Sequence, residues 1–244
     1  YVFSLILSVP YDIIPISANA VLKEFILFCS CLSLSQSITG MYKFTPTMGS
    51  SDKSVGAIAS VEVLWESFGT DVAPNPGDLI TNVTYKKGTI RFETPSTYHE
   101  GNAVIAAKGS DGNILWSWHI WMTDQPQEQV YFDNAGTMMD RNLGATSATP
   151  GDVGALGLLY QWGRKDPFLG SSSIDFKSIE ICRSTIEWPS SVESTSSTGT
   201  IEYSIANPIT FIRQNEMNMD WYYTGDGTND NSRWVVSEKS IYDP

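Results

Sequence analysis

The stretch NAVIAAKGSDGNILWSWHIWM, residues 102–122, decides the fold class of this chain. Two strand-like runs, residues 102–108 and 114–122, flank a short polar segment that contains the pair Asp111-Gly112. An Asp-Gly pair between two such runs is a strong turn signal, because glycine adopts the positive φ that tight hairpin turns need. The stretch therefore predicts a β-hairpin.

The second run of this hairpin is apolar on both of its faces. Successive strand residues point to opposite sides, so its side chains divide by simple alternation. One face carries Trp116, Trp118, Ile120 and Met122, and the other carries Leu115, Ser117, His119 and Trp121. Because apolar groups on both faces need cover on both sides, we predict a central strand of a sheet or sandwich.

Alternation of apolar and polar residues also occurs upstream of the hairpin. Residues 61–66 predict a strand that is half buried on a core. Residues 79–85 and 89–94 predict a second hairpin, in which Gly88 supplies the positive φ of the turn. The buried face of the first strand is predicted to carry Val61, Val63 and Trp65, with both glutamates pointing away.

A linker predicted at residues 125–129 separates a second half, in which Val130 opens a new element. Residues 155–162 carry apolar side chains at the spacing i, i+3, i+4, i+7, which predicts a short amphipathic helix ended by Gly163. The serine-rich and threonine-rich residues 170–200 predict a surface loop. The helix positions are Ala155, Leu158, Leu159 and Trp162, and strands are predicted at residues 200–205 and 209–213.

The composition narrows the classes of partner. Charged residues make up only 17% of the 244 residues and aromatic residues 12%, a balance that favours strands over charged helices. The formal net charge is −12, and adjacent cationic residues occur only at Lys86-Lys87 and Arg164-Lys165. Nucleic-acid binding depends on clustered Lys and Arg, so nucleic acid is not a predicted partner.

Residues 1–40 differ in composition from the rest of the chain, being rich in Leu, Ile, Phe and Ser. Residues 2–9 form an apolar run followed by Ala18-Asn19-Ala20, a cleavage-site pattern. Residues 25–34 form a second apolar run, with the length of a signal-peptide core and too short to span a bilayer. An export signal and non-native sequence are both open interpretations, and we leave this segment outside the predicted fold. The start at Tyr1 rather than Met indicates a fragment or an extended reading frame.

Few residues have the spacing of a catalytic or metal site. His99 and His119 lack the spacing of zinc ligands, and His119 among tryptophans is predicted to be structural. Cys182 has no catalytic signature around it. No catalytic residue, metal site or cofactor is predicted. The carboxylates available for a glycan hydrolase are Asp140, Asp166, Glu180 and Asp226.

One aromatic run is a candidate ligand site. Trp221, Tyr222 and Tyr223 precede a polar loop and are predicted either to form a stacking platform for sugars or to be buried. Asp226 and Asp230 in that loop resemble half of a calcium loop, but the bidentate Glu at its twelfth position is missing. A plain turn is the preferred interpretation of the loop.

Five motifs occur in order along the chain: LWESFGT (64–70), GNAVIA (101–106), ILWSWHIW (114–121), MDRNLGA (139–145) and GLLYQWGRKDPF (157–168). They resemble motifs of surface proteins of Bacteroidetes that carry the Fibrobacter succinogenes major paralogous domain, many of them fimbrillin-associated. The resemblance runs from about residue 42 to the end. It implies a β-sandwich module at residues 41–125, followed at residues 126–244 by a truncated α+β domain similar to C-type lectin-like folds.

The resemblance also implies a function. Such proteins are exported lipoproteins or fimbrial tip components, and the family has no agreed catalytic residues. We therefore expect a mainly β, non-enzymatic module at the bacterial cell surface that acts by binding or assembly, as an adhesin or fimbria-associated protein. Its expected partners are a glycan, a host protein or other pilus subunits. The alternatives are a glycan-active enzyme with paired carboxylates and a gene fragment without independent function.

Overall fold

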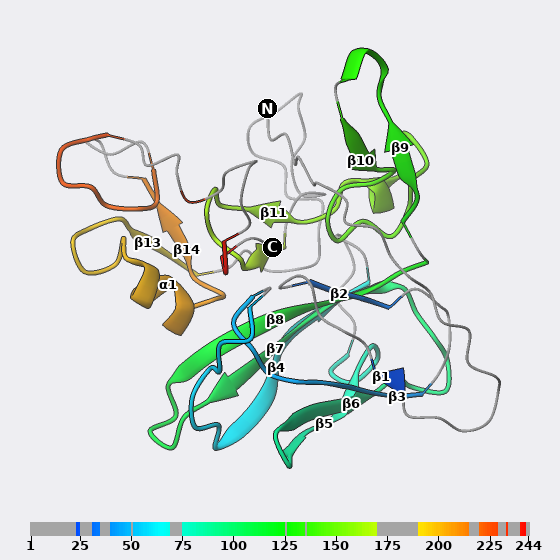
Figure 1. Cartoon of the computed structure of the whole chain (residues 1–244), viewed down its shortest axis with the longest axis horizontal. Coiled ribbons are helices and arrows are strands. Elements are labelled where there is room, and N and C mark those ends of the chain that lie inside the picture. The colour runs from blue at the N-terminus through cyan, green and yellow to red at the C-terminus, as the bar shows by residue number, and fades with distance from the viewer. Residues whose placement is uncertain are drawn as a thin grey trace.

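The computed structural model describes residues 23–24, 31–34, 40–49, 51–68, 75–124, 126–134, 136–169, 190–214, 220–228, 233 and 240–242. This part of the chain is mainly β, with one short α-helix, α1 (Ile201–Ala206). The described strands form two four-stranded sheets and three two-stranded sheets. In Figure 1 the two larger sheets lie together at one end of the molecule and the smaller sheets lie beyond them.

The hairpin predicted from residues 102–122 is confirmed. β7 (Gly101–Lys108) pairs antiparallel with β8 (Ile114–Met122), and Gly112 in the turn has a φ of 81°. The sheet order is β2-β8-β7-β4, with β2 at Cys31–Leu34. β8 is therefore an internal strand, as its two apolar faces predicted.

The second predicted hairpin is also confirmed. β5 (Thr81–Lys86) pairs antiparallel with β6 (Thr89–Glu93). Both turn residues have positive φ, 52° at Lys87 and 75° at Gly88, the combination of a type I′ turn. The sheet has the order β1-β3-β6-β5, with β1 at Lys23–Glu24 and β3 at Met41–Phe44.

The two larger sheets share one apolar core. Phe44 of β3 meets Trp118 of β8 edge to face, with ring centroids 5.3 Å apart. Ile90 and Phe92 of β6 are fully buried in the same cluster. The face of β8 that points into this core carries Trp116, Trp118, Ile120 and Met122, which the alternation placed together.

Part of the N-terminal segment joins these sheets, contrary to our expectation that it lies outside the fold. β1 pairs in parallel with β3, placing Lys23 beside Tyr42. β2 pairs in parallel with β8, placing Cys31 beside His119. Both strands add at a sheet edge, where any backbone with free N–H and C=O groups can pair. Their pairing could therefore not be predicted from the composition of the segment. Cys29 and the apolar run at residues 2–9 lie outside the described residues.

A bulge changes the faces of β4 (Ser60–Ser67). Its pairing with β7 shifts between Val63 and Trp65. Because side chains alternate along a strand, the shift turns Trp65 away from the core and Glu66 toward it. The prediction that Val61, Val63 and Trp65 share one face, with both glutamates opposite, is therefore wrong for Trp65 and Glu66. The Glu66 carboxylate accepts hydrogen bonds of 2.6–3.2 Å from the backbone N–H groups of Gly77, Leu79 and Ile80.

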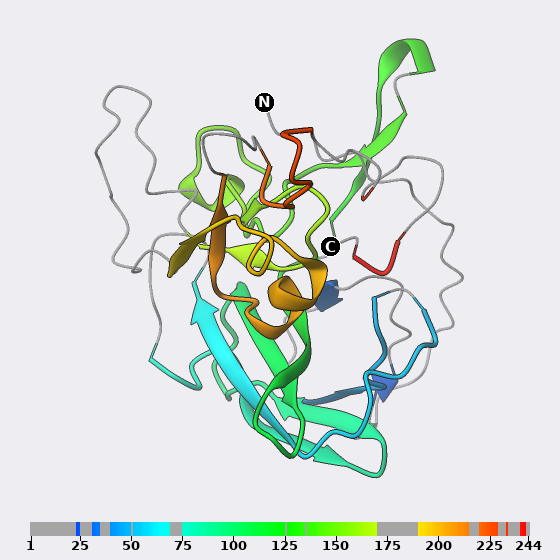
Figure 2. The ribbon, with the colours of Figure 1, turned by 90° about the vertical axis from the view of Figure 1, so that its left-hand side faces the viewer.

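The predicted linker is in fact the start of a hairpin. β9 (Glu128–Val130) pairs antiparallel with β10 (Thr137–Met139), and the 3-10 turn η1 (Phe132–Asn134) lies between them. Figures 1 and 2 both show this hairpin projecting from the rest of the molecule. Val130 thus lies near the tip of the hairpin, where the prediction had a new element opening.

The helix predicted at residues 155–162 does not form. A short 3-10 turn, η2 (Val153–Ala155), is followed by β11 (Leu159–Tyr160), which pairs with β12 (Pro167–Phe168). Gly157 between them has a φ of 72°, a left-handed value that interrupts a right-handed helix. The apolar residues do have helical spacing, but the left-handed conformation of Gly157 prevents a continuous helix through them.

Gly157→Ala is expected to lower the free energy of unfolding by about 2–3 kcal/mol, from left-handed strain plus a close contact. A Cβ at this position would lie 2.6 Å from the backbone oxygen of Leu143. Gly151→Ala is the matched control, since its φ is 85° but no atom lies within 4 Å of the added Cβ. Urea denaturation of both variants measures the difference, and equal losses would contradict the close contact.

Near residue 200 the predicted strand is wrong, because residues 201–206 form α1. Thr200 caps this helix, and its side-chain oxygen accepts a 3.1 Å hydrogen bond from the backbone N–H of Tyr203. The strand predicted at residues 209–213 is confirmed as β14 (Phe211–Arg213), which pairs in parallel with β13 (Ser191–Glu193). β13 lies within the predicted loop, whereas residues 170–189, with Cys182, lie outside the described residues.

Candidate functional site

The second half of the chain covers the outer face of β8 through buried polar contacts. Ser117 donates a 2.6 Å hydrogen bond to the Asp166 carboxylate. The Trp121 indole N–H donates a 3.0 Å hydrogen bond to the backbone oxygen of Ala145. His119 lies between them on the same face and is also bonded to the second half. The outer face of β8 is therefore an internal surface of the molecule.

One group of described side chains resembles a catalytic nucleophile with its base, and it consists of Ser117, Lys165 and Asp166. Lys165 Nζ lies 2.5 Å from both the Ser117 hydroxyl and an Asp166 carboxylate oxygen. Burial lowers the pKa of Lys165, and the Asp166 carboxylate partly offsets this effect. A serine beside a lysine of lowered pKa has the components of a nucleophile and its base. All three side chains are buried, however, so the hydroxyl presents no open face to a substrate.

His119 is buried and both of its ring nitrogens lie within hydrogen-bonding distance of a side chain, which fits the structural role predicted for it. The Asn102 amide nitrogen donates to the backbone oxygen of Gly144, which leaves its oxygen 2.8 Å from His119 Nε2. The Tyr160 hydroxyl lies 3.3 Å from Nδ1. This arrangement fits a neutral ring that donates from Nε2 and accepts at Nδ1. Burial lowers the pKa of His119 to about 3, so the ring stays neutral.

Arg164 and Gln161 hold the short elements of the second half together. The Arg164 guanidinium is buried and donates to the backbone oxygens of Asn207 and Thr210 at 2.7 and 2.8 Å. The Gln161 side chain bonds both backbone groups of Ile212 in β14. The motif GLLYQWGRKDPF thus supplies buried polar groups that link the short elements described in this half.

The proposed hydrolase carboxylates are engaged elsewhere. Asp140 accepts a 2.8 Å hydrogen bond from Arg141, which lowers the pKa of the Asp140 carboxyl. Hydrogen bonds from Thr228 likewise lower the pKa of Asp226. A general acid needs a raised pKa, so both shifts have the wrong direction for that role. Asp166 belongs to the buried group with Lys165, and Glu180 lies outside the described residues.

The loop considered for calcium contains a plain turn in its described part. Asp226 accepts hydrogen bonds from the backbone N–H and hydroxyl of Thr228, at 3.0 and 2.7 Å. Asp230, its proposed partner, lies outside the described residues. Among the residues that the structure does describe, no group of three or more His, Cys, Asp or Glu side chains is placed to hold a metal ion.

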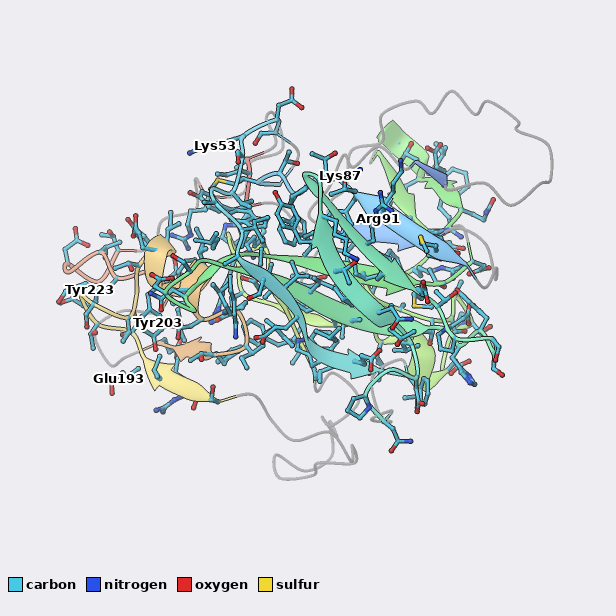
Figure 3. The ribbon with its side chains drawn as sticks, turned by 90° about the horizontal axis from the view of Figure 1, so that it is seen from below. Lys53, Lys87, Arg91, Glu193, Tyr203 and Tyr223 are labelled. Carbon is cyan, nitrogen blue, oxygen red and sulfur yellow. The ribbon has the colours of Figure 1, made fainter. Side chains whose placement is uncertain are left out.

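The predicted aromatic run divides by exposure. Trp221 is buried, Tyr222 is half-buried and the Tyr223 side chain is 36% exposed. Trp221 and Tyr222 pack edge to face, with centroids 5.8 Å apart. In Figure 3 Tyr223 lies at the same end of the molecule as Tyr203 and Glu193. Of the two interpretations, burial holds for Trp221, whereas Tyr223 is open to solvent.

Arg233 ties these aromatic residues to one place. Its guanidinium carbon lies 5.0 Å from the Trp221 ring centre and 4.8 Å from that of Tyr222. It also forms a 2.5 Å ion pair with Asp220. Cation–π contacts and a carboxylate pair together fix the orientation of both rings.

Trp162 is an exposed member of this cluster that the sequence did not reveal. Its side chain is 44% exposed, although the helix prediction gave it a core position. Its backbone oxygen accepts a 2.6 Å hydrogen bond from the Trp221 indole N–H. Gly163 follows with a φ of 77° and has the Arg233 side chain packed against it. We call Trp162, Tyr222 and Tyr223 the aromatic patch.

Comparisons with known proteins leave the function to be argued from the structure. No family model, curated protein or solved structure matches the chain. The motif resemblance is therefore a hypothesis. Of the helices that the structure describes, none has the length and apolar character needed to cross a membrane.

Proposed function

We propose that this chain is part of an exported bacterial cell-surface protein that acts by binding or assembly, and that its aromatic patch binds carbohydrate. In this proposal the two larger sheets are a β-sandwich module, and the second half belongs to an α+β domain similar to C-type lectin-like folds. The support is the motif resemblance together with the acidic, aromatic-rich composition.

The observation that carries the carbohydrate proposal is an exposed aromatic patch on a fixed base. Trp162 and Tyr223 are partly exposed to solvent, whereas Trp221 and Arg233, which donate hydrogen bonds to the Trp162 backbone oxygen, are buried. Aromatic faces carry negative charge density and attract the C–H face of a sugar ring. A base fixed by hydrogen bonds and an ion pair reduces the entropy lost on binding.

Polar groups suited to sugar hydroxyls lie next to the patch. Asp226 and Thr224 belong to the turn that follows Tyr223, and Asp226 is exposed. A few polar groups beside an apolar surface are the usual source of orientation and specificity in small-ligand sites. The patch thus combines stacking surface with hydrogen-bonding groups.

The hydrolase alternative has less support from the described residues. Its candidate carboxylates Asp140 and Asp226 have lowered pKa values, and Asp166 is buried against Lys165. A gene fragment without function would lack cooperative unfolding, so a thermal melt followed by tryptophan fluorescence tests that alternative directly.

A glycan array with the full chain tests the proposal, followed by calorimetric titration of the best ligand. Trp162→Ala and Tyr223→Ala are each expected to weaken binding about 5- to 10-fold, since a stacking contact contributes about 1 kcal/mol. Trp162 is 44% exposed and Tyr223 36%, and neither belongs to the apolar core, so we expect only small changes in melting temperature.

Tyr131→Ala is the matched control, because Tyr131 is an aromatic residue of the same 44% exposure as Trp162 on a different element. We expect it to leave carbohydrate affinity unchanged. Absence of any bound glycan, or an equal loss for Tyr131→Ala, would contradict the proposal.

A further inference from the structure

The hairpin formed by β9 and β10, which we call the projecting hairpin, presents an apolar tip. Phe132 is 92% exposed, Val130 80% and Tyr131 44%. Single exposed apolar residues are common, but three in succession form a patch of the kind that marks an interaction site. In Figures 1 and 2 the hairpin stands clear of the sheets, so nothing else in the described chain covers this tip.

The described residues of the tip have a tight backbone geometry. The backbone N–H of Tyr131 donates a 3.0 Å hydrogen bond to the backbone oxygen of Gly136, which closes the loop. Asp133 has a φ of 57° and Gly136 a φ of 99°. Aspartate is one of the few residue types that tolerate the left-handed region, so Asp133 suits this tight turn.

The base of the projecting hairpin is clamped to the body. The backbone N–H of Asp140 donates a 2.8 Å hydrogen bond to the backbone oxygen of Gln127. Arg141, whose side chain is buried, pairs with Asp140 at 2.8 Å and also with Asp124. The clamp fixes the direction in which the tip points. A pre-oriented tip loses little conformational entropy on docking, as expected of a binding element.

The charges around the tip indicate its partner. Between Gly109 and Asp140 the sequence contains no Lys or Arg, whereas the hairpin carries Glu128 and Asp133. An anionic lipid surface would repel this element, since membrane-binding segments rely on Lys and Arg. A second copy of the chain is disfavoured in the same way by its net charge of −12. The surface that complements this acidic, apolar tip therefore belongs to a protein and carries cationic groups.

We propose that the projecting hairpin is a docking element that inserts Val130 and Phe132 into an apolar recess of a protein partner, bordered by Lys and Arg. The apolar side chains lose water on insertion, and Glu128 and Asp133 pair with the cationic border. Aromatic anchors in desolvated pockets supply most of the affinity at protein interfaces. This proposal is independent of carbohydrate binding by the aromatic patch, which lies on other elements.

Photo-crosslinking tests it. The full chain carrying benzoylphenylalanine in place of Phe132 is expressed in the organism that encodes it and irradiated, and adducts are identified by mass spectrometry. The control carries the probe at Ile209, which is also exposed. We expect position 132, and not position 209, to give one protein adduct whose crosslinked residue lies among apolar side chains bordered by Lys and Arg.

Binding of the identified protein then tests the energetics. Val130→Ser and Phe132→Ser are each expected to weaken its affinity by roughly tenfold or more, and added salt to weaken wild-type binding further. Trp162→Ala should leave this affinity unchanged, which separates the docking element from the aromatic patch. A lipid adduct, an adduct between two copies, no adduct, or the same adducts from both probe positions would overturn the proposal.

Discussion

Replacing Asp166 by alanine is expected to lower the free energy of unfolding by about 3–5 kcal/mol, the usual cost of removing one partner from a buried ion pair. The carboxylate accepts hydrogen bonds from Lys165 at 2.5 Å and Ser117 at 2.6 Å, and lies 3.9 Å from Arg164. All four side chains are buried. The variant leaves two buried cationic groups without their anion. Urea denaturation followed by tryptophan fluorescence measures the loss.

Three further variants make this prediction specific. Asp52→Ala removes an exposed carboxylate and should change stability by no more than about 0.5 kcal/mol. The double variant Lys165→Met with Asp166→Leu should recover part of the loss, because apolar pairs often replace buried ion pairs without cost. If Asp166→Ala does not fold, Asp166→Asn keeps the shape and an acceptor for Ser117. A loss below about 1 kcal/mol for Asp166→Ala would refute the role we give to this carboxylate.

The sequence predicted those elements of the fold that local chemistry determines. Both hairpins were found because Asp111-Gly112 and Lys87-Gly88 encode their turns within a few residues. The helix at residues 155–162 was wrong because one left-handed glycine outweighs apolar spacing. The bulge in β4 was missed because alternation continues through the sequence, and only pairing with β7 displaces it.

The candidate site was predictable only in part, for a related reason. The run Trp221-Tyr222-Tyr223 is visible in the sequence, but which ring is buried depends on Arg233 and Trp162. Trp221 and Trp162 are 59 residues apart in the chain, and Ser117 and Asp166 are 49 apart. Such contacts follow from tertiary structure and leave no periodic signal. One signal was available in the motif GLLYQWGRKDPF. Its polar residues stand among apolar ones, and polar side chains that become buried form hydrogen bonds.

Acidification is expected to destabilise the protein through His119. The pKa of this residue is about 3 in the folded chain, against an ordinary value of 6.5. Above pH 6.5 both states are neutral at this site and the full stability is present. Below it the unfolded chain binds a proton that the folded chain does not, so stability falls by about 1.4 kcal/mol per pH unit. At pH 4.5 the loss from this residue is about 3 kcal/mol.

His119→Gln isolates this contribution from those of the carboxyl groups, because glutamine keeps a donor for Asn102 but does not titrate. Urea denaturation at pH 7.5 and pH 4.5 should show the wild type losing about 3 kcal/mol more than the variant. Nitrogen-15 NMR provides a direct check, with an expected neutral tautomer protonated at Nε2 throughout this range. If the His119 ring instead titrates near pH 6.5, the ring is accessible to water and is not buried as described. The polar contacts between the outer face of β8 and the second half of the chain would then be accessible to solvent.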